Sequence, residues 1–283
     1  PTQGNPIHAL KNGFRQLERL LPNEIDFCGV ATTGSARHLA GAIIGADLIK
    51  NEITSQAAAA LDYMFDVQTV IEIGGQDSKI IIIRDGFVTD FSMNSVCAAG
   101  TGSFLDQQAN KLCIDLQRFS RLAMASSSSI NISGKCAVFA ESDIIHRCQT
   151  GYCIDDIIYG LCKALVHNYL SNVGLGKDIL PPILFQGGVA FNKGIIRAFE
   201  EELKTDIFIP PHPEIMGAIG AAILAKEEME YNKSNFRGFQ LIEYDYKTSS
   251  TECRECNSLC QISQLSLDGK IIASWGGLCD HWQ

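Results

Sequence analysis

The chain has 283 residues and a formal net charge of −9 at pH 7, with 46% hydrophobic and 19% charged residues. This acidic balance disfavours binding to nucleic acids or anionic membrane surfaces, both of which select a basic face. The longest apolar run, residues 39–49, contains Asp47 and is too short to span a bilayer, and the N-terminus lacks the regions of a signal peptide. We therefore expect a cytoplasmic protein of about two domains or one two-lobed fold.

Hydrophobic periodicity predicts a mixed α/β first half. A helix over residues 8–21 stops at Pro22, and a short buried strand over 27–31 and a helix over 53–65 follow. Three strands then form a predicted antiparallel meander, with Gly74-Gly75 and Asp85-Gly86 at its turns: residues 70–73, 79–83 and 87–93.

Helices dominate the second half of the prediction. They cover residues 102–113, 115–125, 139–150, 154–173, 192–203 and 213–228, with strands at 183–185 and 206–209. Residues 229–250 are polar and aromatic and are interpreted as a linker. The mixture of meander strands and helices is typical of layered α/β halves.

Two glycine turns follow apolar strands. The first, within residues 71–79, carries Gly74, Gly75 and Asp77, and the second is Gly187-Gly188 before a predicted helix. Glycine allows a backbone to approach a phosphate closely, and a helix N-terminus favours an anion. Asp77 is a candidate for holding a Mg²⁺-bound water. An ordinary hairpin turn is the alternative for the first segment, but the pair of turns favours a nucleotide crevice.

Eleven cysteines require an explanation, since an odd number excludes complete internal disulfide pairing. Cys97 and Cys136 each stand just before a predicted helix, where a thiolate that binds iron or zinc is favoured. Two ligands are too few for a [4Fe–4S] cluster, but a two-fold dimer supplies four. On spacing alone, two small buried residues remain the alternative. Cys148 and Cys153 are interpreted as packing residues.

Five segments together resemble the ATP-dependent activators of 2-hydroxyacyl-CoA dehydratases, a family close to the ATPase subunits of benzoyl-CoA reductase. The resemblance covers residues 1–228 in order. The matching segments are IEIGGQDSK (71–79), MNSVCAAGTGSFLD (93–106), CAVFAESD (136–143), FQGGVAFNKGI (185–195) and PHPEIMGAIGAAILA (211–225).

The resemblance implies an α/β, actin/Hsp70/sugar-kinase-like fold whose two lobes close on ATP and Mg²⁺. It implies a homodimer with one [4Fe–4S] cluster bridging the subunits, held by Cys97 and Cys136 of each chain. One electron, received from a donor such as ferredoxin or flavodoxin, then passes to the dehydratase. The implied nucleotide-binding residues are Gly74, Gly75, Gln76, Asp77, Gly100, Thr101, Gly102, Gly187, Gly188, Val189, Ala190 and Asn192, with Asp77 also the catalytic candidate.

The sequence departs from the family pattern at both ends. No acidic first phosphate loop of the form D-x-G-S-T occurs, so we expect residues 1–67 to be an incomplete first lobe. Residues 68–228 are then the second lobe, 229–250 a linker and 251–283 a cysteine-rich extension. In that extension Cys253, Cys256, Cys260 and Cys279 predict a second metal site, for zinc or an iron–sulfur cluster.

Two other functions remain open at this point. A sugar or carboxylate kinase of the same fold needs a substrate-binding acid and no cluster. A non-catalytic iron–sulfur interaction module of a larger protein is compatible with the missing first loop.

Overall fold

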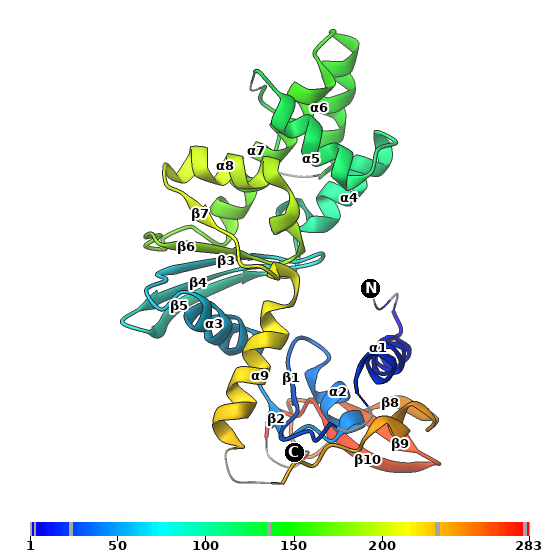
Figure 1. The fold of residues 1–283 in the computed structure, drawn as a ribbon. Helices are drawn as coiled ribbons and strands as arrows, with labels where there is room; N and C mark the ends of the chain where they lie inside the picture. The colour runs from blue at the N-terminus through cyan, green and yellow to red at the C-terminus, as the bar shows by residue number, and fades with distance from the viewer. Residues whose placement is uncertain are drawn as a thin grey trace. The chain divides into compact units, whose positions relative to one another are not determined.

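The computed structural model describes residues 2, 4–22, 25–128, 130–134, 137–229, 233–279 and 282. The chain divides into two compact units, one made of residues 1–55 and 217–283 and the other of residues 56–216. Figure 1 shows their helices and strands in chain order. Among the described residues, none of the helices combines the length and apolar character needed to span a bilayer.

The second unit is built on a five-stranded mixed sheet with the order β5-β4-β3-β6-β7. Its strands are β3 (Thr69–Ile73), β4 (Ser78–Arg84), β5 (Phe87–Asn94), β6 (Ile183–Gln186) and β7 (Ile207–Phe208). The first three strands form the predicted antiparallel meander, and β6 and β7 continue the sheet in parallel with β3. Every residue of β3 and β6 is buried, as expected for apolar strands at the centre of a sheet.

Helices complete the second unit in the places that periodicity predicts. They are α3 (Glu52–Tyr63), most of which lies in this unit, α4 (Gly102–Lys111), α5 (Leu116–Ala125), α6 (Ala137–Gln149), α7 (Ile154–Asn172) and α8 (Lys193–Leu203). The core helix is α7, which packs against α5 and α8. Its Tyr169 hydroxyl donates to the Lys79 carbonyl at 2.7 Å and its ring packs edge-on against Phe199, which contacts Phe185 of β6 in the same way. The sheet and α7 therefore share one apolar core.

The first unit joins the two ends of the chain. Its elements are α1 (Pro6–Leu20), β1 (Ala31–Thr32), α2 (Arg37–Ile44), β2 (Leu48–Ile49), α9 (Met216–Glu228) from its second residue on, the 3-10 helix η4 (Phe239–Ile242) and the strands β8 (Tyr246–Glu252), β9 (Gln261–Leu267) and β10 (Lys270–Trp275). Ile43 and Ile44 of α2 share a core with Leu241, Tyr246 and Leu265. The two segments of this unit are therefore packed together by apolar side chains.

Asp47 also links the two segments of the first unit. Its carboxylate accepts hydrogen bonds from the Val30 main chain (2.9 Å), the Ser234 hydroxyl (2.7 Å) and the Asn235 main chain (2.6 Å). One side chain from the N-terminal segment thus holds the backbone that follows α9 (Met216–Glu228).

The structure differs from the sequence predictions at several elements. The strand expected over 27–31 is limited to Ala31–Thr32, and α2, β2 and the sheet β10-β9-β8 were not predicted. The range 229–250, expected to be a linker, contains η4 and the start of β8 and buries Leu241 and Tyr246. The predicted domain limits at 67, 228 and 250 stay a prediction beside the contact-based limits at 55 and 216.

Candidate nucleotide-binding site

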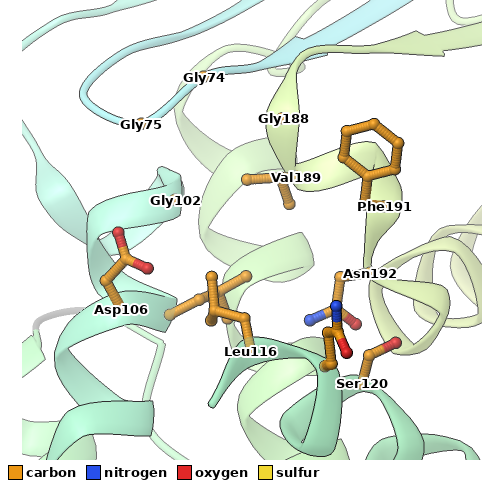
Figure 2. A pocket seen from close by; sticks show the side chains of 12 residues that line it. Gly74, Gly75, Gly102, Asp106, Leu116, Ser120, Gly188, Val189, Phe191 and Asn192 are labelled. Carbon is orange, nitrogen blue, oxygen red and sulfur yellow. The ribbon is translucent and has the colours of Figure 1, made fainter. Parts of the chain in front are cut away.

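A cavity of about 310 Å³ lies in the second unit, where three glycine-containing segments meet (Figure 2). These segments are the β3–β4 turn, the first turn of α4, and the 3-10 helix η2 (Gly188–Phe191) that follows β6. The start of α5 closes the other side. The lining residues are Gly74, Gly75, Gly102, Leu105, Asp106, Leu116, Gln117, Ser120, Gly188, Val189, Phe191 and Asn192.

Main-chain hydrogen bonds hold the first two segments together. The Gly102 N–H donates to the Gly74 carbonyl at 2.9 Å, and the Ser103 N–H donates to the Gly75 carbonyl at 2.8 Å. The Ser103 hydroxyl donates to the same Gly75 carbonyl at 2.5 Å. The β3–β4 turn is therefore fixed against the N-terminus of α4, the end of a helix that attracts anions.

At two positions the backbone of a neighbouring segment lies too close for any residue with a side chain, which explains why glycine stands there. Gly187 has a φ of +89°, and a Cβ there would lie 2.3 Å from the Ile73 carbonyl oxygen. A Cβ on Gly102 would lie 2.9 Å from the Gly74 oxygen and 3.1 Å from Val189. Side chains at these positions would separate the segments that form the cavity. Gly75 and Gly188 differ, because a Cβ on either one would meet nothing within 4 Å.

Asn192 joins the cavity to helix α8. Its side-chain oxygen accepts from the main-chain N–H groups of Gly194 (3.0 Å) and Ile195 (3.3 Å), which is the geometry of an N-cap. Its side-chain nitrogen is buried and has no hydrogen-bond partner among the described residues. Figure 2 shows this side chain beside the cavity, where it is placed to offer a donor to a ligand.

A buried ion-pair group lies just behind the first glycine turn. The Lys79 ammonium is 2.9 Å from the Glu72 carboxylate and 3.0 Å from the Asp77 carboxylate. Burial works to lower the pKa of Lys79, but the charges and hydrogen bonds of Glu72 and Asp77 outweigh it and raise that pKa. The lysine is therefore charged at neutral pH and fixes the Asp77 side chain at the turn.

The predicted binding residues divide into two groups. Gly74, Gly75, Gly102, Gly188, Val189 and Asn192 line the cavity. Six others are not in its lining, although each lies in or directly before one of the three segments: Gln76, Asp77, Gly100, Thr101, Gly187 and Ala190. Thr101 is fully buried and donates from its hydroxyl to the Ala98 carbonyl, while a Cβ on Gly100 would lie 2.8 Å from Asn168. These two residues position the start of α4.

The sequence did not predict the cavity-lining residues that lie outside the glycine motifs. Asp106 stands one helical turn after Gly102 on α4, and its carboxylate lies beside the cavity in Figure 2. The i, i+4 spacing from Gly102 was the signal that could have found it. Leu116, Gln117 and Ser120 come from α5, for which no motif exists. Phe191 is 61% exposed and forms an apolar wall.

Comparison with known protein families matches residues 8–225 to the BadF/BadG/BcrA/BcrD ATPase family. The chain belongs to this family. It is 37% identical over 212 residues to the (R)-2-hydroxyglutaryl-CoA dehydratase activating ATPase of Acidaminococcus fermentans, which covers 74% of this chain and 79% of that protein. It is 33% identical over 196 residues to the 2-hydroxyisocaproyl-CoA dehydratase activator of Clostridioides difficile, which covers 68% of this chain and 72% of the activator.

A solved structure supports the same relationship. The activator of the 2-hydroxyisocaproyl-CoA dehydratase from Clostridium difficile, with bound ADPNP, matches with a TM-score of 0.69 at 32% identity. The match covers 81% of this chain and 83% of that one. The α/β fold predicted from the resemblance is therefore confirmed as the actin-like fold of these activators.

One predicted cluster ligand of this family member is described by the structure. Cys97 is partly exposed and lies just before the 3-10 helix η1 (Ala98–Gly100), which leads into α4. Asn94 fixes its backbone, accepting from the Cys97 N–H at 2.9 Å and donating to the Cys97 carbonyl at 2.8 Å. Val96 beside it is 96% exposed. Cys136 lies outside the described residues.

Cys148 and Cys153 are both exposed, so their interpretation as packing residues is wrong. Among the residues that the structure describes, the one group of three possible ligand atoms within 4.8 Å is Cys153, Asp155 and Asp156. Asp156 accepts from the Ser126 hydroxyl at 2.7 Å and from the Ser128 N–H at 3.0 Å, so its role is to hold that loop. The four tail cysteines lie at one end of the β8–β9–β10 sheet.

Proposed function

We propose that this protein is an ATP-dependent activator that donates one electron to an enzyme of the 2-hydroxyacyl-CoA dehydratase type. The observation that carries the proposal is the meeting of three glycine segments around one cavity in a member of this ATPase family. Relatives named as activators of such dehydratases, and the neighbour with bound ADPNP, support the choice of partner and nucleotide.

The cavity residues have the chemistry to hold ATP. The Gly74-Gly75 turn and the N-terminus of α4 offer backbone groups and a positive helix end to phosphates. Phe191 offers an aromatic face to the base, and the buried Asn192 side-chain nitrogen offers a donor. Gln76, Gly187 and Ala190 belong to the same loops and complete the proposed set.

Two carboxylates are candidates to hold Mg²⁺ through water, because Mg²⁺ keeps several waters and takes few protein oxygens. Asp77, fixed by Lys79, is our choice for orienting the ion or the attacking water. Asp106 reaches the cavity from the first turns of α4. When bound, Mg²⁺ neutralises phosphate charge, and the role of this chain is to place one carboxylate at the β3–β4 turn and the other on α4.

The partly exposed Cys97 thiol fits the role of an outward-facing ligand. We propose that Cys97 and Cys136, with the same pair from a second copy of the chain, hold one [4Fe–4S] cluster in a homodimer. Bound there, the cluster supplies a low-potential electron, received from a ferredoxin or flavodoxin. Because α4 connects the Cys97 segment to the cavity, a nucleotide-dependent shift of α4 would also move the Cys97 thiol. Such coupling requires ATP and ADP to prefer different states of the protein.

Anaerobic reconstitution tests this function. The protein is purified without oxygen, loaded with iron and sulfide, and mixed with ATP, a reduced ferredoxin and a 2-hydroxyacyl-CoA dehydratase. We expect ATP hydrolysis and dehydratase activation, with activation and the visible cluster absorbance lost in Cys97→Ala. A colourless protein that phosphorylates sugars or carboxylates overturns the proposal in favour of a kinase. Absence of any nucleotide hydrolysis, with the cluster intact, overturns it in favour of an interaction module.

A further inference from the structure

The last part of the chain carries four cysteines that lie beyond the family match, which ends at residue 225. They are Cys253, Cys256, Cys260 and Cys279, and none of them forms a disulfide. We propose that these four thiols form a binding site for a single tetrahedral Zn²⁺ ion, independent of the nucleotide-binding cavity.

The strand register places two of the thiols side by side. Glu252 at the end of β8 pairs with Gln261 at the start of β9, and the Cys253 N–H donates to the Cys260 carbonyl at 2.8 Å. Cys253 and Cys260 therefore continue the antiparallel ladder as directly opposed residues. Side chains of opposed residues point to the same face, with Cβ atoms about 5 Å apart. A single ion can be reached by both sulfur atoms.

The hairpin loop supplies the third thiol. Between Cys253 and Cys260 the chain turns at Cys256, whose carbonyl accepts from the Leu259 N–H at 3.4 Å. Leu259 has a positive φ of 45°, so the loop is a tight turn. The spacing Cys-x₂-Cys-x₃-Cys on a hairpin loop is of the kind found in structural zinc sites.

The strand β10 returns the fourth thiol to the same place. Trp275 at its end pairs with Ser263 near the start of β9. Gly276, with a φ of +108°, lies so close that a Cβ there would be 2.7 Å from the Gln261 carbonyl oxygen. Cys279 follows three residues later. All four cysteines thus come from three chain segments that converge at one end of one small sheet.

A hydrogen-bond donor already contacts one of the four sulfur atoms. The Trp282 indole N–H donates to the Cys253 sulfur at 3.2 Å, and Cys253 is 5% exposed. Donors of this kind orient metal ligands and stabilise a thiolate. No three of the four sulfur atoms lie within 4.8 Å of one another, so zinc binding draws the Cys256 loop and the Cys279 segment inward. Zn²⁺ holds four thiolates at about 2.3 Å and fits a pair of opposed residues closed by two loops.

Metal titration of the full chain tests the proposal. The protein, in a Cys97→Ala/Cys136→Ala background that removes the other proposed site, is stripped with a chelator under reducing conditions. It is then titrated with Zn²⁺ and, separately, with Co²⁺, which reports tetrahedral thiolate ligation by its visible absorption. We expect one equivalent of metal per chain and a rise in the melting temperature.

Variants at exposed thiols locate the site. Cys256→Ser and Cys279→Ser are each expected to weaken Co²⁺ binding at least about tenfold, or about 1.4 kcal/mol. Cys28→Ser and Cys113→Ser, also exposed but distant in sequence, are the matched controls and should bind like the parent. The proposal is overturned if Cys256→Ser and Cys279→Ser bind the metal as tightly as the parent. It is also overturned if the purified chain contains iron and an equal amount of sulfide, and these are lost in the two tail variants. The complete absence of Zn²⁺ or Co²⁺ binding by the folded, reduced chain overturns it as well.

Discussion

The Gly102 main-chain N–H donates to the Gly74 carbonyl oxygen at 2.9 Å, so the first turn of α4 is hydrogen-bonded directly to the β3–β4 turn. Gly74 and Gly75 lie in the turn that joins β3 to β4, whereas α4 directly follows the segment that carries Cys97. A ligand that moves the β3–β4 turn therefore also moves the N-terminus of α4. This contact is the structural basis for expecting communication between nucleotide and thiol.

Blocking the cavity should abolish nucleotide binding without unfolding the protein. Gly188 lines the cavity, and a Cβ there meets nothing within 4 Å. We expect Gly188→Val to weaken ADPNP binding at least about tenfold in calorimetry, because the added methyl groups occupy ligand space. The melting temperature should stay unchanged. Gly13→Val, on the exposed face of α1, is the control with the same added volume; equal affinity in both variants would contradict the assignment.

The neighbouring glycine should behave in the opposite way. Gly187 has a φ of +89° and ψ of 165°, a region open almost only to glycine, and its Cβ position is 2.3 Å from a carbonyl oxygen. Gly187→Ala is therefore expected to lower the free energy of unfolding in urea by about 1–3 kcal/mol or more. Gly188→Ala provides the comparison and should unfold like the parent. Similar stability losses in both would show that the close approach is not rigid.

Substitutions at Asn192 separate its cap from its free donor. Asn192→Ala removes the N-cap of α8 and should cost about 1 kcal/mol of stability. Asn192→Asp keeps an oxygen for the cap but replaces the cavity-facing nitrogen with a second oxygen. It should therefore keep the capping oxygen and lose affinity for ATP, since the buried donor beside the cavity is removed. ATP affinity in Asn192→Asp equal to that of the parent would argue against a nucleotide at this position.

The buried lysine behind the turn is expected to be essential for stability. Lys79→Met leaves the Glu72 carboxylate, whose side chain is 7% exposed, without its close cation. Removing one partner of such a buried pair costs about 3–5 kcal/mol. Chemical denaturation measures this loss. The control is Lys247→Met, which breaks a fully solvated pair with Asp245 and should leave the unfolding midpoint in place.

Acid should weaken the first unit through Asp47. Burial raises the pKa of this carboxyl, but hydrogen bonds from Asn235, Ser234 and Val30 outweigh it, and the net effect is a lowered pKa. A group with a lowered folded-state pKa stabilises the fold above its unfolded value of 3.8, and that contribution is lost as the pH falls through the folded value. The free energy of unfolding of the parent should thus decrease as the pH falls below about 4.

The matching variant isolates this effect. Asp47→Asn does not titrate in this range, so its unfolding free energy should be lower than that of the parent at pH 7, and the difference should shrink toward pH 3. About 2 kcal/mol is expected at neutral pH for hydrogen bonds to a charged group. A difference that is constant between pH 3 and pH 7 would show that the carboxylate charge does not matter.

The sequence predicted the elements whose patterns are strong and local. The meander was found because apolar runs alternate with glycine turns, and α7 because it has an apolar face over nineteen residues. In contrast, α2 was missed because it is short and carries Gly41 in its interior. That glycine packs closely against β2, since a Cβ would lie 2.8 Å from the end of the Ile49 side chain. Gly45, left-handed at its C-cap, was a signal for its end.

The sequence predicted site residues only where the backbone conformation restricts the type of residue that can stand there. The glycine segments and Asn192 could be found because close approach and helix capping restrict residue type. Leu116, Gln117 and Ser120 of α5 could not, because side chains on a helix face become neighbours of a cavity only through tertiary packing. The strands β8 (YKTSSTE) and β9 (QISQLSL) contain many serine or threonine residues and few apolar ones. Their hydrophobic pattern was therefore too weak to predict strands, and the cysteines between them were interpreted only as a metal site.

The two units have different requirements during synthesis. Residues 56–216 are contiguous, so the sheet and the cavity can assemble as soon as this stretch has left the ribosome. Residues 37–47 must wait, because the core partners Leu241, Tyr246 and Leu265 and the Asp47 donors Ser234 and Asn235 are made after the central stretch. Helix α2, already synthesised, keeps Ile43 and Ile44 uncovered in the meantime. The nascent chain therefore exposes these two isoleucines until after its central part has folded.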